Sequence, residues 1–297
     1  MMQEIELNNI SVDEITTTQL NKNGVEVSVL RLDKIHPLIS GNKWFKLRYY
    51  IEDAQKQNKK TILTFGGAWS NHILATAAAC KLYKLNSIGI IRGEKPRELS
   101  STLEQAMKLG MKLIFSARED YRIGIIPEEL KEEEYYLVNE GGYGDKGAAG
   151  AATILDYCDK KKYTYICCAA GTGTMTAGLI MASLPSNTVI GISVLKNNTG
   201  LEEKIRSLLP VANPNFQLLH DYHFGGYAKY KPELIGFMNE YFSRTNIPTD
   251  FVYTGKLFFA INDLINADYF ATGSKMLIIH SGGLQGNSSL EKGTLIF

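Results

Sequence analysis

Short runs of β-branched and apolar residues alternate with helical patterns along most of this chain, and this alternation constrains the fold more than any other feature. The predicted strands are residues 60–65, 87–93, 111–116, 135–142, 163–169, 188–195, 216–222 and 275–281. Between them lie helical patterns at residues 70–85, 98–110, 147–162, near 200–209, 231–244 and 256–267. Strands that alternate with helices form βαβ units, so the sequence predicts an α/β fold with mainly parallel twisted sheets flanked by helices.

The chain contains more predicted strands than one small sheet needs, which favours two α/β domains. Its 297 residues are enough for one large or two ordinary domains. We expect a larger domain made of residues 1–45 and 151–297, and a smaller one inserted at residues 46–150. A ligand would then lie in the cleft between the two domains.

The overall charge argues against whole classes of partner. The formal net charge is +1, with 21% charged and 44% apolar residues, so no strong field favours nucleic acid or an anionic membrane. The first ten residues lack a basic region followed by an apolar run, and we therefore expect a cytoplasmic protein. Residues 163–195 carry no charge, but glycines, threonines and Pro185 interrupt them, which favours a buried α/β core over a transmembrane helix.

Glycine-rich segments follow several of the predicted strands. They read FGGAWSN, NEGGYGDKGAAG, AAGTGTMTAG, HFGGYAK and IIHSGGLQGN, and each except HFGGYAK comes directly after a strand. Ligands of parallel α/β sheets bind beyond the carboxyl ends of strands, where glycine lets the backbone approach closely. A single segment of this kind is more often an ordinary turn. Together the segments favour one shared pocket.

The segment AAGTGTMTAG, residues 169–178, follows a strand and opens a helix. Backbone N–H groups at a helix N-terminus, joined by the hydroxyls of Thr172 and Thr174, form a site suited to a phosphate. The segment lacks the G-K-[ST] of a Walker loop and the G-x-G-x-x-G of a dinucleotide fold. It therefore favours a small phosphorylated cofactor held without metal. The four cysteines form no C-x-x-C motif, which argues against a zinc site.

Lys43 lies where the glycine-containing bend of SGNKWFKL becomes a helix. A lysine whose amine pKa is lowered, in a site that holds a phosphate, can form a Schiff base with an aldehyde. The ordinary alternative is a solvated lysine in the first helical turn. A cation at a helix N-terminus is unfavourable by about 0.3–1 kcal/mol, and this cost slightly favours the functional interpretation.

Five blocks of the sequence occur in the order found in one known family. They are GNKWFKL, GGAWSNH, GTGTMTAG, VYTGK and HSGG, and the resemblance extends from about Arg31 to Gly286. The chain resembles the pyridoxal-phosphate enzymes of the tryptophan-synthase-β-like fold (fold type II) that comprise 1-aminocyclopropane-1-carboxylate (ACC) deaminase and D-cysteine desulfhydrase. The resemblance implies pyridoxal 5'-phosphate as the cofactor, a small amino acid as the substrate and a homodimer as the assembly.

The resemblance also implies roles for residues in these blocks. Lys43 would bind the cofactor covalently as a Schiff base, Asn71 would contact its ring hydroxyl, and Ser70 would meet the substrate carboxylate or assist proton transfer. Tyr227 and Tyr253 match tyrosines on the substrate side. The residues that match the phosphate loop are Gly171, Thr172, Gly173 and Thr174, followed by Met175 where relatives often carry a hydroxyl.

Thr254 and Ser281 match the two cofactor-side positions that separate the branches of this family. ACC deaminases carry glutamate and leucine there, whereas desulfhydrases carry small hydroxyl residues at both, so the chain resembles the desulfhydrase branch. A carboxylate opposite the pyridine nitrogen would strengthen the electron sink that opening a cyclopropane requires. A threonine hydroxyl supplies no such charge, but a weaker sink still supports loss of thiolate. We therefore expect D-cysteine desulfhydrase-type α,β-elimination, giving pyruvate, ammonia and sulfide.

Other interpretations of these residues stay open. ACC deaminase is the second candidate, followed by dehydration of serine or threonine, a β-replacement reaction, and a binding protein that has lost turnover. A hydrolase with Ser70 as nucleophile is disfavoured, because no G-x-S-x-G elbow is present and nothing marks His72 as its base. Lys46 and Lys256 are expected to be structural or solvent-facing.

Overall fold

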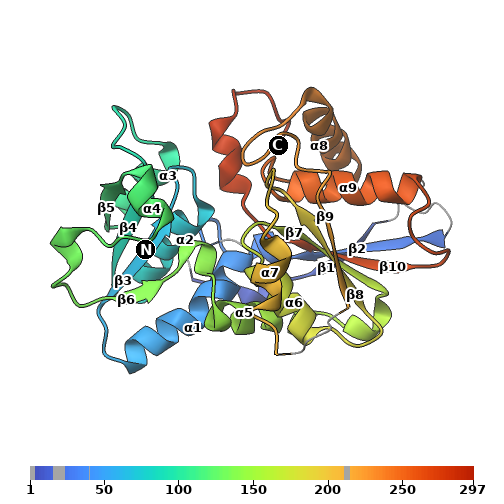
Figure 1. Ribbon diagram of the computed structural model, residues 1–297. Helices are drawn as coiled ribbons and strands as arrows, with labels where there is room; N and C mark the ends of the chain where they lie inside the picture. Colours follow the sequence, from blue (N-terminus) through green and yellow to red (C-terminus); the bar gives the residue numbers. More distant parts are fainter. Residues whose placement is uncertain (1–3, 16–23, 40, 211–214) are drawn as a thin grey trace.

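The computed structural model describes residues 4–15, 24–39, 41–210 and 215–297. These residues form two sheets, one of six strands in the order β1-β2-β10-β7-β8-β9 and one of four strands in the order β5-β4-β3-β6. Figure 1 shows the smaller sheet with its helices on the left and the larger sheet on the right, with α1 and α5 below and between them. The predicted α/β fold is confirmed.

The smaller sheet is parallel throughout. Its strands are β3 (Thr61–Gly66), β4 (Asn86–Arg92), β5 (Met111–Ser116) and β6 (Tyr136–Val138). The helices around it are α2 (Asn71–Leu82), α3 (Ser101–Lys108) and α4 (Arg118–Arg122). Apolar side chains of β3 and β4 pack on Tyr121 of α4 on one face, while Ile91 packs with α2 and α3 on the other. Burial on both faces explains the continuous apolar runs in these strands.

The larger sheet is parallel except at one edge. Its strands are β1 (Val12–Ile15), β2 (Glu26–Arg31), β7 (Tyr165–Ala170), β8 (Thr188–Ser193), β9 (Phe216–Leu219) and β10 (Lys275–His280), and β1 pairs antiparallel with β2. In β7, Ile166 and Cys168 face one core cluster, whereas Cys167 and Ala169 face another. The uncharged residues 163–195 thus form β7, α6 (Thr174–Ala182) and β8, as expected of a buried core.

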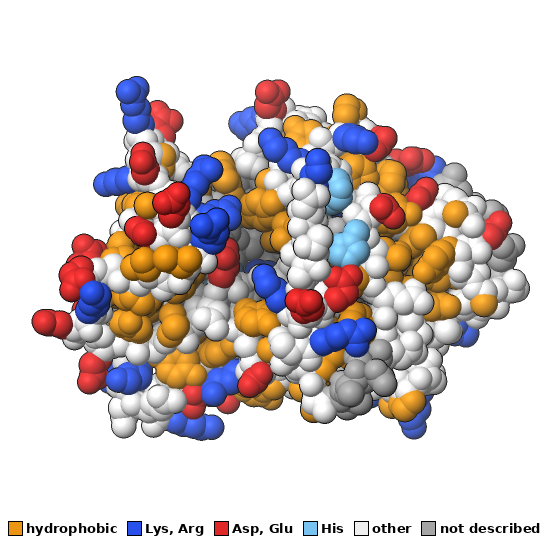
Figure 2. Space-filling model, in the orientation of Figure 1, with side chains coloured by type: hydrophobic (Ala, Val, Ile, Leu, Met, Phe, Trp, Pro, Cys, Tyr) orange, Lys and Arg blue, Asp and Glu red, His pale blue; other side chains and the backbone are white. Residues whose placement is uncertain are grey.

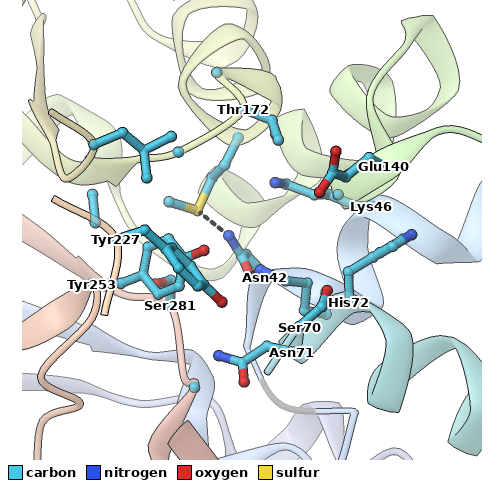
Figure 3. A pocket seen from close by; sticks show the side chains of 18 of the residues that line it. Asn42, Lys46, Ser70, Asn71, His72, Glu140, Thr172, Tyr227, Tyr253 and Ser281 are labelled. Atoms are coloured by element: carbon cyan, nitrogen blue, oxygen red, sulfur yellow. Dashed lines mark hydrogen bonds between the residues drawn. The ribbon is translucent and has the colours of Figure 1, made fainter. Parts of the chain in front are cut away.

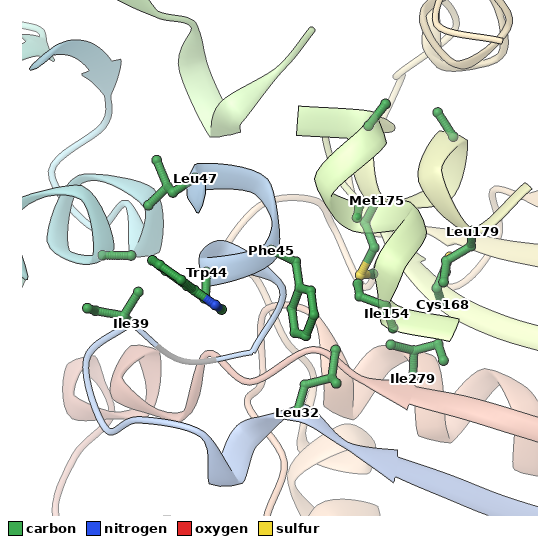
Figure 4. Close-up of a cluster of buried hydrophobic side chains, with 14 of the residues drawn as sticks. Leu32, Ile39, Trp44, Phe45, Leu47, Ile154, Cys168, Met175, Leu179 and Ile279 are labelled. Atoms are coloured by element: carbon green, nitrogen blue, oxygen red, sulfur yellow. The ribbon is translucent and has the colours of Figure 1, made fainter. Parts of the chain in front are cut away.

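Helix α1 (Asn42–Lys56) connects the two sheets through its packing. Its residues Trp44, Phe45 and Leu47 are buried in a cluster that also contains side chains of α5 (Asp145–Ala152) and α6 (Figure 4). Glycine allows this close approach, since a Cβ on Gly150 would lie 1.9 Å from the carbonyl oxygen of Phe45. The start of α1, which carries Lys43, is therefore fixed by its neighbours.

Three further α-helices pack on the larger sheet or on the helices that cover it. They are α7 (Leu201–Arg206), α8 (Pro232–Thr245) and α9 (Thr254–Asn266). Residues Leu257, Phe258 and Ile261 of α9 pack on the face of the sheet opposite to α6. In the described residues no helix is both long enough and apolar enough to cross a membrane.

The structure adds to the predicted elements in several places. Strands β1 and β2 were not predicted, and β6 is only three residues long because the chain turns at Glu140–Gly142. The expected helix at residues 147–162 ends as an α-helix at Ala152 and continues in short 3-10 turns. The expected domain boundaries at residues 45/46 and 150/151 both fall inside helices, and the division into two domains stays a prediction.

Candidate active site

A cavity of about 300 Å³ lies where the carboxyl ends of strands from both sheets meet. The loops after β3 and β6 and the end of β4 supply one side, and the loops after β7, β8 and β10 supply the other. Figure 2 shows a hollow near the centre of this face, between the two halves of the surface. Arg92, Glu140 and Lys204 are among the charged residues that line the cavity. Its volume and position are typical of a small-molecule site.

The loop between β7 and α6 forms one end of the cavity. Gly171, Thr172 and Gly173 line it, and Gly173 precedes the helix with φ +84°, a conformation that glycine adopts readily. Thr174 is fully buried, and its hydroxyl lies 3.0 Å from that of Thr172. Asn198 donates to the carbonyl oxygen of Gly171 at 3.3 Å and so holds the loop. The N–H groups at the start of α6 thus meet the cavity, as a phosphate site requires.

Lys43 lies in the first turn of α1 and lines the cavity. Its Nζ donates to Asn42 Oδ1 at 3.0 Å and lies 5.6 Å from the centre of the Tyr253 ring. The position is set by Gly41, which has φ +60°, and by Asn42, whose backbone N–H donates to the carbonyl oxygen of Ser281 at 3.2 Å. Burial lowers the pKa of Lys43 to about 8, although the nearby Asp250 carboxylate opposes this shift.

Ser70 and Asn71 stand at the N-terminus of α2, beside the cavity. The Ser70 hydroxyl accepts from the backbone N–H of Ile73 at 3.4 Å and caps the helix. Asn71 Oδ1 is buried and has no hydrogen-bond partner within the described part of the chain. A Cβ on Gly283 would lie 3.0 Å from Asn71 Nδ2, so the loop after β10 closes tightly on this side chain. An unpaired buried amide oxygen indicates a missing donor, such as a ligand hydroxyl.

Two tyrosines form the opposite side of the cavity. The Tyr227 and Tyr253 rings meet edge to face with centroids 6.4 Å apart. The Tyr227 hydroxyl donates to the carbonyl oxygen of Trp69 at 3.2 Å and so bridges to the loop after β3. Figure 3 shows both tyrosines beside Ser281 and across the cavity from Lys46 and Glu140.

Thr254 and Ser281, the two hydroxyl positions, differ in their surroundings. Ser281 lines the cavity. Thr254 is fully buried and does not line it; its Oγ1 donates to Asp250 Oδ1 and accepts from the Asp250 backbone N–H, both at 2.7 Å. Of the two hydroxyls, Ser281 is therefore the one free to meet a ligand.

Asp250 is a buried carboxylate that the sequence analysis did not single out. Its Oδ1 also accepts from the backbone N–H of Thr254, and its Oδ2 accepts from those of Val252 and Tyr253, at 2.8–2.9 Å. Burial raises its pKa, and these donors oppose that shift. The carboxylate does not line the cavity. Its hydrogen bonds hold the turn that carries Tyr253. An Asp that precedes a helix by a few residues is a capping signal in the sequence.

Lys46, which was expected to be structural or solvent-facing, is buried and lines the cavity. Burial and the nearby Lys43 ammonium lower its pKa well below the ordinary value. Four basic residues, Lys43, Lys46, Arg92 and Lys204, and one acidic residue, Glu140, are among the described residues that line the cavity. Such an excess suits a doubly charged phosphate and a substrate carboxylate.

His72 of α2 is also buried beside the cavity. Its Nε2 lies 2.9 Å from the Thr64 hydroxyl, which itself donates to the carbonyl oxygen of Val138. Nε2 therefore carries the proton, and Nδ1 is an acceptor with no partner in the described residues. Burial and the two neighbouring lysines lower the pKa of His72 to about 3, so the ring is neutral.

Comparison with known proteins identifies the chemistry of this cavity. Residues 13–282 match the family described as "Pyridoxal-phosphate dependent enzyme". The chain belongs to this family of pyridoxal-phosphate dependent enzymes. It is 30% identical over 296 residues to the bifunctional D-cysteine desulfhydrase/1-aminocyclopropane-1-carboxylate deaminase of Arabidopsis thaliana, with 89% of this chain and 74% of that protein covered.

Two further relatives place the chain within this family of pyridoxal-phosphate enzymes. D-cysteine desulfhydrase of Salmonella newport is 24% identical over 290 residues, with 88% of this chain and 87% of that protein covered. The crystal structure of an ACC deaminase homologue superposes with a TM-score of 0.77 at 26% identity, over 96% of this chain and 93% of that chain. The chain is thus a fold type II member of the ACC deaminase and D-cysteine desulfhydrase family, and pyridoxal phosphate is its cofactor.

The cavity fits this cofactor on its own geometry. Pyridoxal phosphate supplies an aldehyde that combines with an amine and a ring that withdraws electrons from the substrate's α-carbon. Lys43 would hold the aldehyde carbon, and the loop Gly171–Gly173 would hold the phosphate. The unpaired Asn71 Oδ1 would accept from the ring hydroxyl. These assignments use the residues expected from the sequence.

The lowered pKa of Lys43 gives a prediction for the protein freed of cofactor. Covalent attachment needs the neutral amine, so its rate should rise about tenfold per pH unit below pH 8 and level off above it. An ordinary lysine would keep gaining rate up to about pH 10. The measurement is the growth of visible absorbance after mixing with pyridoxal phosphate at pH 6–10. A rate that still climbs between pH 9 and 10 would contradict the buried amine.

Lys46 gives a second prediction, for cofactor affinity. Lys46→Met should weaken binding of pyridoxal phosphate by about 10–100-fold, because a charge-assisted contact to the phosphate contributes about 1.5–3 kcal/mol. Equilibrium dialysis would measure this affinity. Pyridoxal, which lacks the phosphate, is the matched control ligand, and its affinity should change much less. An equal loss of affinity for both ligands would show that Lys46 does not bind the phosphate.

Proposed function

We propose that this protein catalyses α,β-elimination on a small amino acid with a good β leaving group, with D-cysteine as the first candidate. One molecule of cysteine and one of water would give pyruvate, ammonia and hydrogen sulfide. The observation that carries this proposal is that the cavity presents the Ser281 hydroxyl, while the nearby Asp250 carboxylate is fully engaged in hydrogen bonds outside it. Glu140, the one acidic residue among the described lining residues, lies across the cavity from Ser281 (Figure 3). A ring nitrogen on the Ser281 side would meet a hydroxyl and no carboxylate, which favours loss of thiolate over opening of a cyclopropane.

The side chains around the cavity have complementary tasks in this proposal. Lys43, with a pKa of about 8, is partly neutral at physiological pH and suits the removal of the substrate's α-proton. The N-terminus of α2 at Ser70 offers N–H groups to the substrate carboxylate. Tyr227 and Tyr253 close the substrate side and exclude water from the reacting atoms.

The second candidate is ACC deamination, which relatives in the same family are named for. A panel of D-cysteine, L-cysteine, β-chloro-D-alanine, D-serine and ACC, assayed for keto acid and sulfide, separates the two. We expect pyruvate from D-cysteine and β-chloro-D-alanine and little 2-oxobutanoate from ACC. Faster turnover of ACC than of D-cysteine would overturn the proposal. A yellow protein that releases no keto acid from any of them would instead be a binding protein.

We also propose that the protein is cytoplasmic and, on the resemblance to this enzyme family, that it forms a homodimer. Light scattering of the purified protein would give its mass in solution. A mass of about 33.0 kDa would correspond to a single chain and contradict the dimer.

A further inference from the structure

Lys256 is a buried amine that the proposed chemistry does not use. It lies in the first turn of α9 and is fully buried. Its Nζ donates to the carbonyl oxygens of His223 at 2.8 Å and Gly226 at 2.7 Å. A buried ammonium is costly unless strong acceptors surround it, so these two contacts are what keep it in place.

The segment that Lys256 contacts has an unfavourable backbone. Phe224, Gly225, Gly226 and Ala228 all have positive φ, at +51°, +98°, +117° and +51°. Positive φ is unusual for phenylalanine and alanine, and such conformations persist only when contacts outside the segment impose them. The residue enclosed by this run is Tyr227.

The same two carbonyl groups also accept backbone hydrogen bonds inside the turn. The His223 oxygen accepts from the backbone N–H of Gly226 at 3.0 Å, and the Gly226 oxygen accepts from that of Lys229 at 3.2 Å. Lys256 therefore joins the acceptors of two successive turns with a single charged group. This double turn sets where Tyr227 leaves the backbone.

We propose that Lys256 is a positioning residue that holds Tyr227 over the cavity through the turn at residues 223–228. Without the ammonium, two carbonyl groups in the interior would lose a strong donor, and the turn would relax toward negative φ. Tyr227 would then lose its contact with the Trp69 carbonyl and its edge-to-face packing on Tyr253. The proposal concerns the turn itself and holds for whichever substrate the cavity accepts.

Limited trypsin digestion tests the turn without any assay of activity. In Lys256→Met, cleavage after Lys229 should be at least about tenfold faster than in the parent protein, while other sites keep their rates. Lys292→Met, which changes an exposed lysine, is the matched control and should leave cleavage after Lys229 unchanged. Unchanged protection at Lys229 in a folded Lys256→Met protein overturns the proposal. If this variant does not fold, Lys256→Gln replaces it and should also accelerate cleavage after Lys229, by a smaller factor.

A double-mutant cycle tests the same proposal by enzyme kinetics. Of the two tests, only this one depends on the proposed function. Lys256→Met should lower kcat/KM about tenfold in the parent protein and less than about twofold when Tyr227 is already alanine. Equal losses in the two backgrounds would mean that Lys256 acts generally on stability and would refute its link to Tyr227. If no substrate is turned over, the proposed function fails, and the trypsin result still decides the role of Lys256.

Discussion

Replacing Lys43 with alanine is expected to remove the visible absorbance of the purified protein and to lower turnover at least about a thousandfold. The variant loses the amine that binds the cofactor covalently and also the base positioned for the substrate's α-proton. Absorbance spectra and keto-acid release measure the two losses in the same samples.

Controls separate this loss from a failure to fold. Lys292→Ala removes an exposed lysine and should keep the parent's absorbance and turnover. Circular dichroism of Lys43→Ala should match the parent, since the Lys43 amine contacts Asn42 by one hydrogen bond and the Tyr253 ring at 5.6 Å within the described residues. A small primary amine added to the variant should restore part of the turnover. Full activity in Lys43→Ala would show that this amine neither binds the cofactor nor removes the α-proton.

Replacing Gly41 with alanine is expected to destabilise the protein by about 3 kcal/mol or more. A Cβ at this position would lie 1.8 Å from the carbonyl oxygen of Ser281, and φ is +60°. Neither the backbone of the β10 loop nor the start of α1 can move without breaking the hydrogen bond from Asn42 to Ser281. Both a steric clash and an unfavourable φ contribute, which places the change among the strongly destabilising classes. Urea unfolding measures the difference.

Gly236→Ala is the matched glycine control. Gly236 lies inside α8, and a Cβ there would meet nothing within 4 Å. Alanine at this helix position should raise stability by about 0.5–1 kcal/mol. Because Gly41 also fixes Lys43, Gly41→Ala should lose cofactor affinity along with stability, whereas Gly236→Ala should keep it. Similar stabilities for the two variants would show that the loop at Gly41 adapts.

The sequence by itself determined the fold class and much of the cavity lining. Apolar runs of strand length alternating with helical patterns leave few options besides parallel sheets covered by helices. Glycine-rich segments after those strands indicated where the carboxyl ends converge. Several expected residues do line one cavity: Lys43, Ser70, Asn71, Gly171, Thr172, Gly173, Tyr227, Tyr253 and Ser281. Their roles in the reaction stay predictions, because these roles were inferred from local sequence patterns and from the family resemblance.

The tertiary structure alone decided the properties that depend on distant neighbours. Strand β1 is short and at an edge, so it has little apolar patterning, and β2 takes its place next to that edge by pairing with β1 and β10. Lys46 and His72 are ordinary residues in the sequence, and only packing buries them beside Lys43. Thr254 matches a cofactor position by sequence, yet Asp250 holds its hydroxyl away from the cavity. Burial and hydrogen-bond partners come from non-local contacts, which residue order along one helix or loop does not specify.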